Sequence, residues 1–142
     1  MARMKIEMPQ DWAYSTEIEV RVSDLNYGNH LANQQFLAFA QEARVRFFAT
    51  YGFTELDFGG TSLIQADAAM TFKGEGHLGD RVHIDLALKQ TGNSSLDVFY
   101  RFTNATKGKP MAEIRTAIVC FDYQKGKAVG LSQRALDSGI FG

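Results

Sequence analysis

The chain has 142 residues, of which 45% are hydrophobic, and its formal net charge is −1. This length suits one domain with a core of its own, so a single domain is expected over residues 1–142. The near-neutral charge, with no block of one sign, argues against binding to nucleic acid or to an anionic membrane. Met1 to Gln10 has no apolar stretch like that of a signal peptide, and no run reaches the roughly 18 apolar residues of a membrane-inserted helix. The one cysteine, Cys120, cannot form an internal disulfide, so a cytoplasmic location is expected.

The first predicted strand covers residues 15–22. Its apolar residues Ile18, Val20 and Val22 alternate with charged residues, which is the pattern of a strand with one buried face. Residues 23–30 are rich in polar and turn-forming side chains, and they are predicted to form a loop.

A long helix is predicted over residues 33–51. Asn33 is a typical N-cap residue, and Gly52 is a typical helix terminator. Apolar side chains recur at helical spacing, and others add apolar surface elsewhere around the helix: Phe36, Leu37, Ala38, Phe39, Ala40, Ala43, Val45, Phe47, Phe48 and Tyr51. A helix that is apolar over most of its circumference is expected to be largely enclosed by other elements.

The rest of the chain is dominated by strand patterns. Four further strands are predicted, at residues 61–72, 81–89, 96–102 and 111–123, with a short helix at residues 133–137. Turn signals lie between them at residues 92–93, 107–110 and 124–126. Because short turns join antiparallel neighbours, the sequence predicts an α+β protein with a five-stranded antiparallel sheet wrapped around one long central helix.

The segment from Arg21 to Asn33, followed by Phe36-Leu37 and Gln41-Glu42-Ala43-Arg44, resembles the 4-hydroxybenzoyl-CoA thioesterase family of hotdog-fold proteins. That family typically shows Asp-Thr-Asp, a short loop, Gly-His-Val-Asn-Asn and then an aromatic-rich helix with Glu-Ala-Arg. Leu78-Gly79-Asp80 is similar to the family's Leu/Phe-Gly-Asp turn. The resemblance covers nearly the whole chain in its order of elements. It implies the hotdog fold and hydrolysis of acyl-CoA or acyl-carrier-protein thioesters.

The resembling segment departs from the family pattern at a position that matters for catalysis. Asp24 matches the family's first aspartate, but Asn26 stands where many members carry a second, catalytic aspartate. An amide is neither a nucleophile nor a general base near neutral pH, although Asn26 could hydrogen-bond a thioester carbonyl or position a water. A simple turn-forming role is the alternative for Asn26. Asn29 replaces a usual glycine, and Ala32 replaces the first asparagine.

The start of the predicted helix suits the stabilisation of an oxyanion. Helix starts carry unsatisfied backbone N–H groups and the positive end of the helix dipole. In the resembling family a backbone N–H at this position polarises the thioester carbonyl, and the position maps to Asn33. Gly28 would let a substrate approach the backbone closely.

Four residues are candidates for activating water: Asp24, Glu42, Asp67 and His30. Asp67 interrupts a strand of small and apolar residues, and it is expected to face the helix start of a second copy as a base with a raised pKa. The structural alternatives are a turn or capping carboxylate for Asp24, a salt bridge or buried hydrogen bond with Arg44 or a sheet residue for Glu42, and a loop histidine bonded to local backbone for His30.

The expected site therefore has two sets of residues. The candidate catalytic residues are Asn26, Asn33, Asp67 and Asp24, and the candidate substrate-binding residues are Tyr27, Gly28, Asn29, His30, Glu42, Ser94 and Ser95. Basic residues near turns or strand ends could hold the phosphates of coenzyme A: Lys73, Arg81, Lys89 and Lys107. No metal site is expected, because His77 and His83 have no partner at metal-ligand spacing. Coenzyme A enters only as part of the substrate, so no separate cofactor is expected.

A single sheet beside one helix leaves an unpaired strand edge, and such edges are usually covered or paired. In hotdog proteins two sheets join edge to edge, so the resemblance implies a homodimer or homotetramer with sites between subunits. Two other functions stay open. One is a protein that binds acyl thioesters without hydrolysing them, which Asn26 favours. The other is a dehydratase of the same fold, for which no His-plus-acid pattern is evident.

Overall fold

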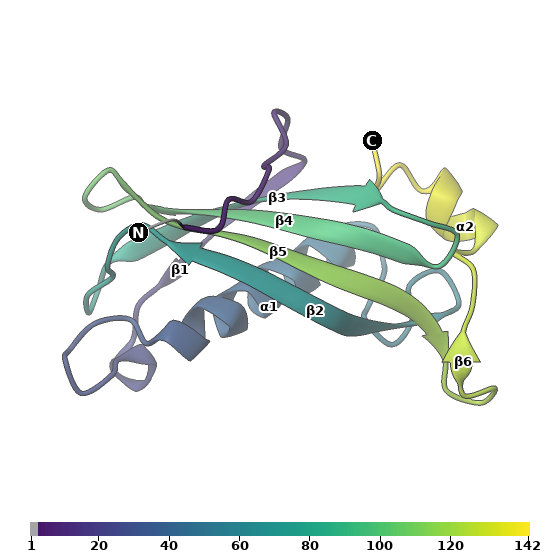
Figure 1. Ribbon diagram of the computed structural model, residues 1–142, viewed down its shortest axis with the longest axis horizontal. Helices are drawn as coiled ribbons and strands as arrows, with labels where there is room; N and C mark the ends of the chain where they lie inside the picture. The colour runs from purple at the N-terminus through teal and green to yellow at the C-terminus, as the bar shows by residue number, and fades with distance from the viewer. Residues whose placement is uncertain (1–2) are drawn as a thin grey trace.

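The computed structural model describes residues 3–142, which form one antiparallel sheet with a long helix packed beside it (Figure 1). Met1 and Ala2, which belong to the expected domain and to the N-terminal segment considered above, lie outside the described residues. The elements in chain order are β1 (Tyr14–Glu19), a 3₁₀ helix η1 (Val22–Asp24), α1 (Asn33–Ala49), β2 (Ser62–Phe72), β3 (Arg81–Gln90), β4 (Ser95–Asn104), β5 (Lys109–Asp122), β6 (Lys127–Ala128) and α2 (Gln133–Asp137). Neither helix in residues 3–142 has the length and apolar character needed to span a bilayer.

The sheet has the strand order β1-β3-β4-β5-β2, and every neighbouring pair is antiparallel. The predicted turns at residues 92–93 and 107–110 each join two adjacent strands, so β3, β4 and β5 form a meander. Strand β2 pairs with β5 along one side, and within residues 3–142 its other side pairs with no strand. The five long strands match the predicted sheet. The two-residue strand β6 was not predicted, because two residues are too few to show alternation.

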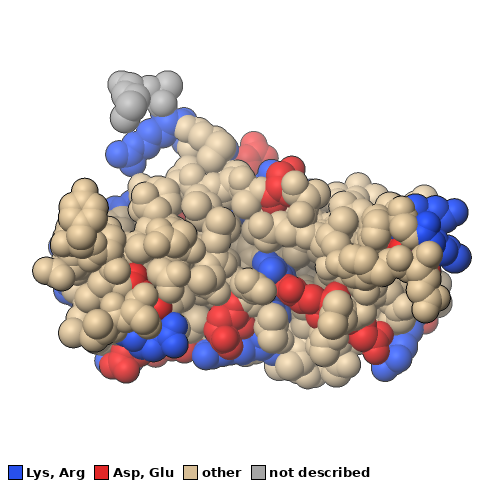
Figure 2. All heavy atoms as spheres, turned by 90° about the horizontal axis from the view of Figure 1, so that it is seen from below, with Lys and Arg blue, Asp and Glu red and all other residues tan. Residues whose placement is uncertain are grey.

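Helix α1 packs one face against the sheet. Its buried aromatic side chains include Phe36, Phe47 and Phe48, and they meet sheet residues such as Ile84 and Phe102 in a single core. Each buried side chain of this size stabilises the fold by about 1.5–3 kcal/mol relative to exposure. The opposite face of α1 is exposed, at Gln34, Ala38, Gln41, Glu42, Val45 and Ala49. The expectation that α1 is largely enclosed is therefore not met within one chain, because the sheet covers only one side of the helix. Figure 2 shows basic and acidic groups interspersed over the side seen from below.

The ends of two elements differ from the prediction. Strand β1 stops at Glu19, and Val22 belongs instead to η1, which turns the chain toward the loop before α1. Helix α1 begins at Asn33 as predicted, but Ala32 is its N-cap residue and no side chain caps it. The helix ends at Ala49, just before Gly52, which adopts a φ of 73° that favours glycine.

The side of the core at α1 also holds a buried charge, that of Arg44. Arg44 of α1 is 5% exposed, and its Nη1 donates to the Tyr100 hydroxyl at 2.8 Å. Its Nε pairs with the Glu55 carboxylate, and the Tyr100 hydroxyl also bonds the Thr116 hydroxyl at 2.8 Å. Burial raises the pKa of the Tyr100 hydroxyl, so this group stays neutral and can hydrogen-bond both partners. This network ties α1 to the loop before β2 and to the centre of the sheet.

Candidate active site at the start of helix α1

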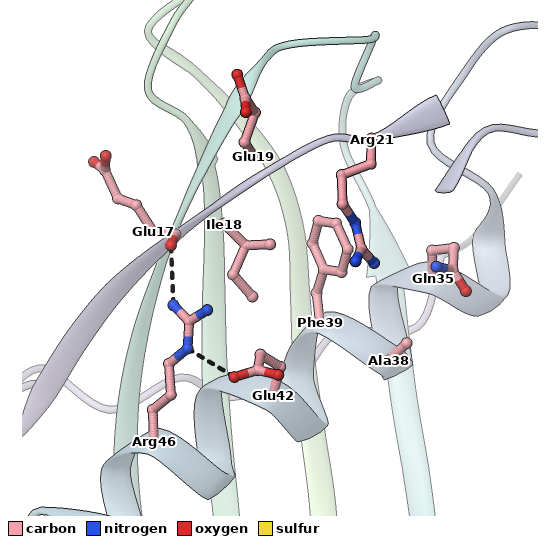
Figure 3. Close-up of a pocket in the computed structure, with 9 residues that line it drawn as sticks. All are labelled: Glu17, Ile18, Glu19, Arg21, Gln35, Ala38, Phe39, Glu42 and Arg46. Carbon is pink, nitrogen blue, oxygen red and sulfur yellow. Dashed lines mark hydrogen bonds and ion pairs between the residues drawn. The ribbon is translucent and has the colours of Figure 1, made fainter. Parts of the chain in front are cut away.

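A groove of about 470 Å³ runs between β1 and α1 (Figure 3). Arg46 crosses it, because its Nε donates to Glu42 at 2.8 Å and its Nη1 donates to the Glu17 carbonyl at 3.1 Å. Arg21 and Gln35 lie at the end of the groove near the start of α1. The expected structural partner of Glu42, Arg44 or a sheet residue, is corrected here, because Glu42 pairs with Arg46 of its own helix. Glu42 lies on the exposed face of α1, where Arg46 one turn later is within reach, whereas Arg44 points into the core.

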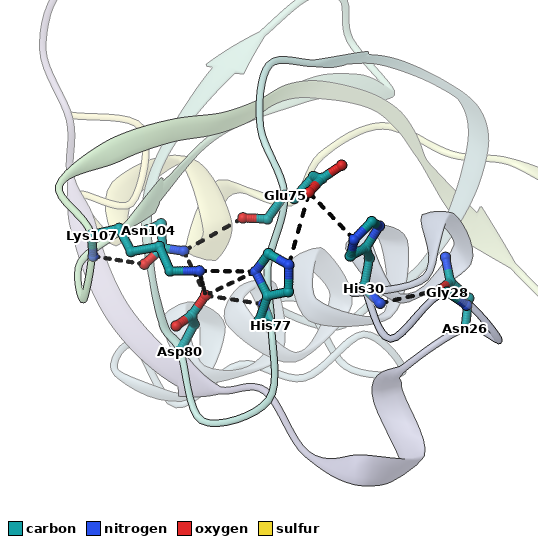
Figure 4. Close-up of polar contacts among 8 residues, drawn as sticks. All are labelled: Asn26, Gly28, His30, Glu75, His77, Asp80, Asn104 and Lys107. Carbon is teal, nitrogen blue, oxygen red and sulfur yellow. Dashed lines mark hydrogen bonds and ion pairs between the residues drawn. The ribbon is translucent and has the colours of Figure 1, made fainter.

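The loop of residues 25–32 is closed by hydrogen bonds around Asn26 (Figure 4). Asn26 Oδ1 accepts the backbone N–H groups of Gly28 at 2.9 Å and His30 at 3.2 Å. The backbone N–H of Asn26 donates to the His30 carbonyl at 2.9 Å. Asn29 has a φ of 63°, which asparagine tolerates better than most residues. The side-chain oxygen of Asn26 therefore shapes the loop, while its Nδ2 donates to no acceptor within residues 3–142.

Asp24 fixes the other end of this loop. Its side chain is fully buried, and its oxygens accept the Arg21 backbone N–H at 2.8 Å, the Arg21 guanidinium and Gln35 Nε2 at 2.7 Å. Burial acts to raise the pKa of Asp24, but the hydrogen bonds from Arg21 and Gln35 and the Arg21 charge outweigh it, so the pKa lies below its ordinary value. A carboxylate so fully engaged serves as an anchor for the loop.

The start of α1 presents free backbone donors. The N–H of Ala32 donates to the Asp24 carbonyl at 3.0 Å, and the N–H of Gln35 donates to the Ala32 carbonyl at 2.9 Å. Between them, the N–H groups of Asn33 and Gln34 donate to no acceptor among the described residues. Both lie at the positive end of the helix dipole. This pair of donors can stabilise the negative oxygen of a tetrahedral intermediate.

A second loop, residues 73–80, lies against the first and brings three ionisable side chains together (Figure 4). The backbone N–H of Leu31 donates to the Gly76 carbonyl at 2.7 Å, which joins the two loops. His30 Nε2 lies 3.4 Å from Glu75 Oε2, and His77 Nε2 lies 3.8 Å from the same oxygen. The two imidazole rings meet edge to face, with centroids 4.9 Å apart. Sequence reasoning missed Glu75 and gave His77 no partner, because nothing in the spacing shows that the two loops touch.

Asp80 holds the far side of this group. It is 5% exposed, and its Oδ2 accepts Asn104 Nδ2 at 2.8 Å and the backbone N–H of His77 at 3.0 Å. Burial acts to raise the pKa of Asp80, but bonds from Asn104, His77 and Lys107 outweigh it, so the pKa is lowered and the group is a carboxylate. Lys107 Nζ lies 3.2 Å from Asp80 Oδ2 and 2.8 Å from His77 Nδ1.

Asp67 does not lie near the helix start of its own chain. A bulge between Gln65 and Asp67 shifts the register of β2 against β5, so Asp67 lies opposite Ala117. Its carboxylate pairs with Arg115 at 3.1 Å, and Arg115 also pairs with Asp97. Because Arg115 alternates with the core-facing residues of β5, Asp67 lies on the sheet face away from α1.

The remaining expected substrate-binding residues are spread apart. Tyr27 is fully exposed at the tip of the loop of residues 25–32. Ser94 and Ser95 lie at the β3–β4 turn, where the Ser95 hydroxyl accepts a hydrogen bond from Thr91 at 2.9 Å. This turn follows the end of β3, and the start of β3 adjoins the loop of residues 73–80, so about 30 Å of strand separates the serines from the helix start. One chain therefore does not bring them to the same site.

The sequence matches the thioesterase-like superfamily over residues 20–137. The chain belongs to this superfamily. No curated protein matches the chain by sequence.

Solved structures share the fold of this thioesterase-like chain. A 1,4-dihydroxy-2-naphthoyl-CoA thioesterase from Synechocystis is similar with a TM-score of 0.81 and 21% identity, over 88% of this chain and 93% of that one. A Staphylococcus aureus protein solved in complex with CoA gives 0.79 and 13%, over 94% of this chain and 85% of that one. A probable thioesterase from Escherichia coli gives 0.70 and 20%, over 89% and 98%. These similarities confirm the hotdog fold that the resemblance implied.

Two features characterise the site of this thioesterase-like protein. Asn26 uses its side-chain oxygen to accept two backbone N–H groups within the loop. Beside that loop stands a group of His30, Glu75 and His77, and the Leu31–Gly76 hydrogen bond joins the two segments that carry it.

Proposed function

We propose that the protein hydrolyses acyl-CoA or acyl-carrier-protein thioesters to a free acid and a thiol. The observation that carries this proposal is the pair of N–H groups at Asn33 and Gln34, which donate to no acceptor in residues 3–142, at the helix start of a thioesterase-like chain. Two similar structures support it, one of a thioesterase acting on an aromatic acyl-CoA and one of a protein in complex with CoA.

In the proposed reaction the N–H groups of Asn33 and Gln34 polarise the thioester carbonyl. Water adds to the carbonyl carbon, its proton passes to a base, and the carbonyl oxygen becomes an oxyanion facing the N–H groups. Collapse of this intermediate breaks the C–S bond, and the leaving thiolate takes up the proton to give the thiol. One donor of this kind contributes about 2.7–4 kcal/mol to the stabilisation of the transition state.

We assign the activation of water to the group of His30, Glu75 and His77. Asp24 is fully engaged by Arg21 and Gln35, and Asp67 lies on the other face of the sheet. Glu75 in contrast is exposed and contacts both histidines, and His30 lies in the loop that leads to the helix start. A histidine held by a carboxylate is a common general base near neutral pH.

The proposed working form is a homodimer or homotetramer. The outer edge of β2 is exposed at residues 65–68 and would pair with the same edge of a second copy. Such pairing would extend the sheet across the two chains. It would also add residues of the second copy to the region beside α1, which one chain leaves open. The buried thiol of Cys120 supports a cytoplasmic location.

A substitution at Asn33 tests the carbonyl-polarising role directly. Proline fits the first position of a helix and has no N–H, and Ala32 already has the extended backbone that proline requires before it. We expect Asn33→Pro to lower kcat by about 10²–10³-fold. The matched control Asn33→Ala keeps the N–H and should retain most of the activity. The readout is thiol release from a panel of aliphatic and aromatic acyl-CoAs.

A protein that binds acyl thioesters without hydrolysing them is the second candidate, favoured by Asn26 at the position of the family's aspartate. Tight binding of acyl-CoA without thiol release from any member of the panel would support this second function. Equal turnover by the proline and alanine variants would remove the N–H of Asn33 from the mechanism.

A further inference from the structure

We propose that His30, Glu75 and His77 form a binding site for a divalent transition-metal ion of the zinc class. One donor atom from each of the three side chains lies within 4.8 Å of the other two. Two imidazoles and one carboxylate are a donor set that zinc uses with a fourth position open to water. The side chains are partly exposed, so an ion can reach them from solvent.

The distances are close to those of a formed site. Zinc–nitrogen and zinc–oxygen bonds of about 2.0–2.2 Å in a tetrahedron place neighbouring ligand atoms about 3.3–3.5 Å apart. His30 Nε2 is already 3.4 Å from Glu75 Oε2, and His77 Nε2 is 3.8 Å from it. All three donor atoms lie within 4.8 Å of one another, so rotation of the two imidazoles about their side-chain bonds would complete the approach to one ion.

The backbone holds the two loops that carry these ligands in a fixed relation. Leu31 follows His30 in the first loop, and Gly76 lies between Glu75 and His77 in the second. The Leu31–Gly76 hydrogen bond therefore adjoins all three ligands along the chain. Gly76 allows this close contact, because a Cβ there would lie 2.9 Å from Met111 Cε and 3.2 Å from Leu31 Cβ. The site is therefore largely organised before an ion arrives, which lowers the entropy cost of binding.

Asp80 lies on the side of His77 where a metal-bound histidine normally has its outer partner. If His77 binds through Nε2, its Nδ1 carries the hydrogen and needs an acceptor. Asp80 Oδ2 lies 3.9 Å from His77 Nδ1, and Asn104 and the His77 backbone hold it in place. A buried carboxylate behind a histidine ligand fixes the ring and strengthens its donation to the metal.

Lys107 opposes the ion at this same position. Its ammonium group lies 2.8 Å from His77 Nδ1 and 3.2 Å from Asp80 Oδ2. It donates to the ring nitrogen that must itself become a donor when the metal binds, and it adds a positive charge near the site. Metal binding therefore requires Lys107 Nζ to move away from His77, and removal of Lys107 strengthens binding. Tighter zinc binding after removal of Lys107 is expected for this site and not for zinc bound elsewhere on the surface.

Zinc titration tests the site. The full chain is first freed of metal with a chelator, and zinc binding is then measured by competition with a chromogenic zinc indicator. We expect one zinc per chain, and affinities about tenfold or more weaker in His77→Gln and in Glu75→Gln. Lys107→Met should bind several-fold more tightly than the unchanged protein. The control variant is His83→Gln. His83 also lies between two carboxylates, those of Glu17 and Asp85, but no second histidine of residues 3–142 joins them. This variant should bind zinc as the unchanged protein does.

Thiol release measured on the same samples separates the zinc site from the proposed function. The inference of a zinc site rests on the proposed function only for the effect of zinc on catalysis. Zinc binding with the expected order of affinities establishes the site, whether or not zinc changes the rate of hydrolysis. Affinities that are equal in the unchanged protein, His77→Gln and Lys107→Met overturn it, even if the metal-free protein hydrolyses thioesters. Zinc binding with no thiol release in either form would keep the site and remove the thioesterase function.

Discussion

The side-chain oxygen of Asn26 accepts the backbone N–H of Gly28 at 2.9 Å, and the same oxygen reaches the N–H of His30. Aspartate at this position would keep that oxygen and put a second oxygen in place of the amide nitrogen, which donates to no acceptor within residues 3–142. We expect Asn26→Asp to preserve the loop and to raise kcat by about tenfold or more, because a general base contributes about 10²–10⁴-fold. Steady-state thiol release is the measurement. Asn26→Ala removes the oxygen that accepts the two loop N–H groups, so it should lower activity. A lower kcat in Asn26→Asp as well would mean that the amide nitrogen of Asn26 is needed.

Asp24 makes stability depend on pH in a predictable direction. Its pKa in the folded protein lies below that of the unfolded chain, so its contribution is fully present above the unfolded pKa of about 3.9 and is lost as the pH falls through the lower folded value. Asp24→Asn should lower the free energy of unfolding by about 2 kcal/mol near pH 6, with a smaller difference near pH 3. Urea unfolding at the two pH values measures this. The exposed Asp11→Asn should change stability by less than about 0.5 kcal/mol near pH 6.

The Tyr100 hydroxyl joins Arg44 to Thr116 in the core. Tyr100→Phe leaves the ring in place but deprives a buried guanidinium and a buried hydroxyl of a partner, so it should lower the free energy of unfolding by about 1–3 kcal/mol. Tyr123→Phe, on an exposed ring, should change it by less than about 0.5 kcal/mol. Urea unfolding compares the two. Similar small effects would show that water or another group satisfies Arg44 when the hydroxyl is absent.

The free edge of β2 carries the prediction about assembly. Ala68 lies in the exposed stretch of this strand, and a lysine there would place two positive charges close together when two copies pair. We expect the unchanged chain to sediment as a dimer or tetramer and Ala68→Lys to weaken association by about tenfold or more. Gln124→Lys adds the same charge at the β5–β6 turn and serves as the control. Association that is unaffected by Ala68→Lys would place the interface elsewhere.

Much of the fold could be predicted because its patterns are local. Strand β3 alternates between buried and more exposed residues from Arg81 to Leu86, and its bounds were predicted to within one residue. The short helix at Gln133–Asp137 was predicted as observed. The extent of burial of α1 was not predictable in the same way. Apolar residues on its outer face, such as Ala38 and Val45, resemble core residues in the sequence although the sheet does not cover them.

The candidate site was predictable where it depends on one loop and not where it depends on contacts between segments. The loop of residues 25–32 and the helix start follow from neighbouring residues. The position of Asp67 depends on the bulge after Gln65, because strict alternation from Leu63 would have placed Asp67 on the helix side of the sheet. The contact of Glu75 with His30 depends on the path of the chain between β2 and β3, and no pattern in the sequence encodes that distance.

The hydrogen bond between Leu31 and Gly76 also couples the motions of the two loops that it joins. The Leu31 amide hydrogen can exchange with solvent only when the two loops separate at this point. A molecule or ion held on either side would slow that separation. The exchange rate of this single amide would therefore report whether a molecule or ion is bound at either loop, without any added probe.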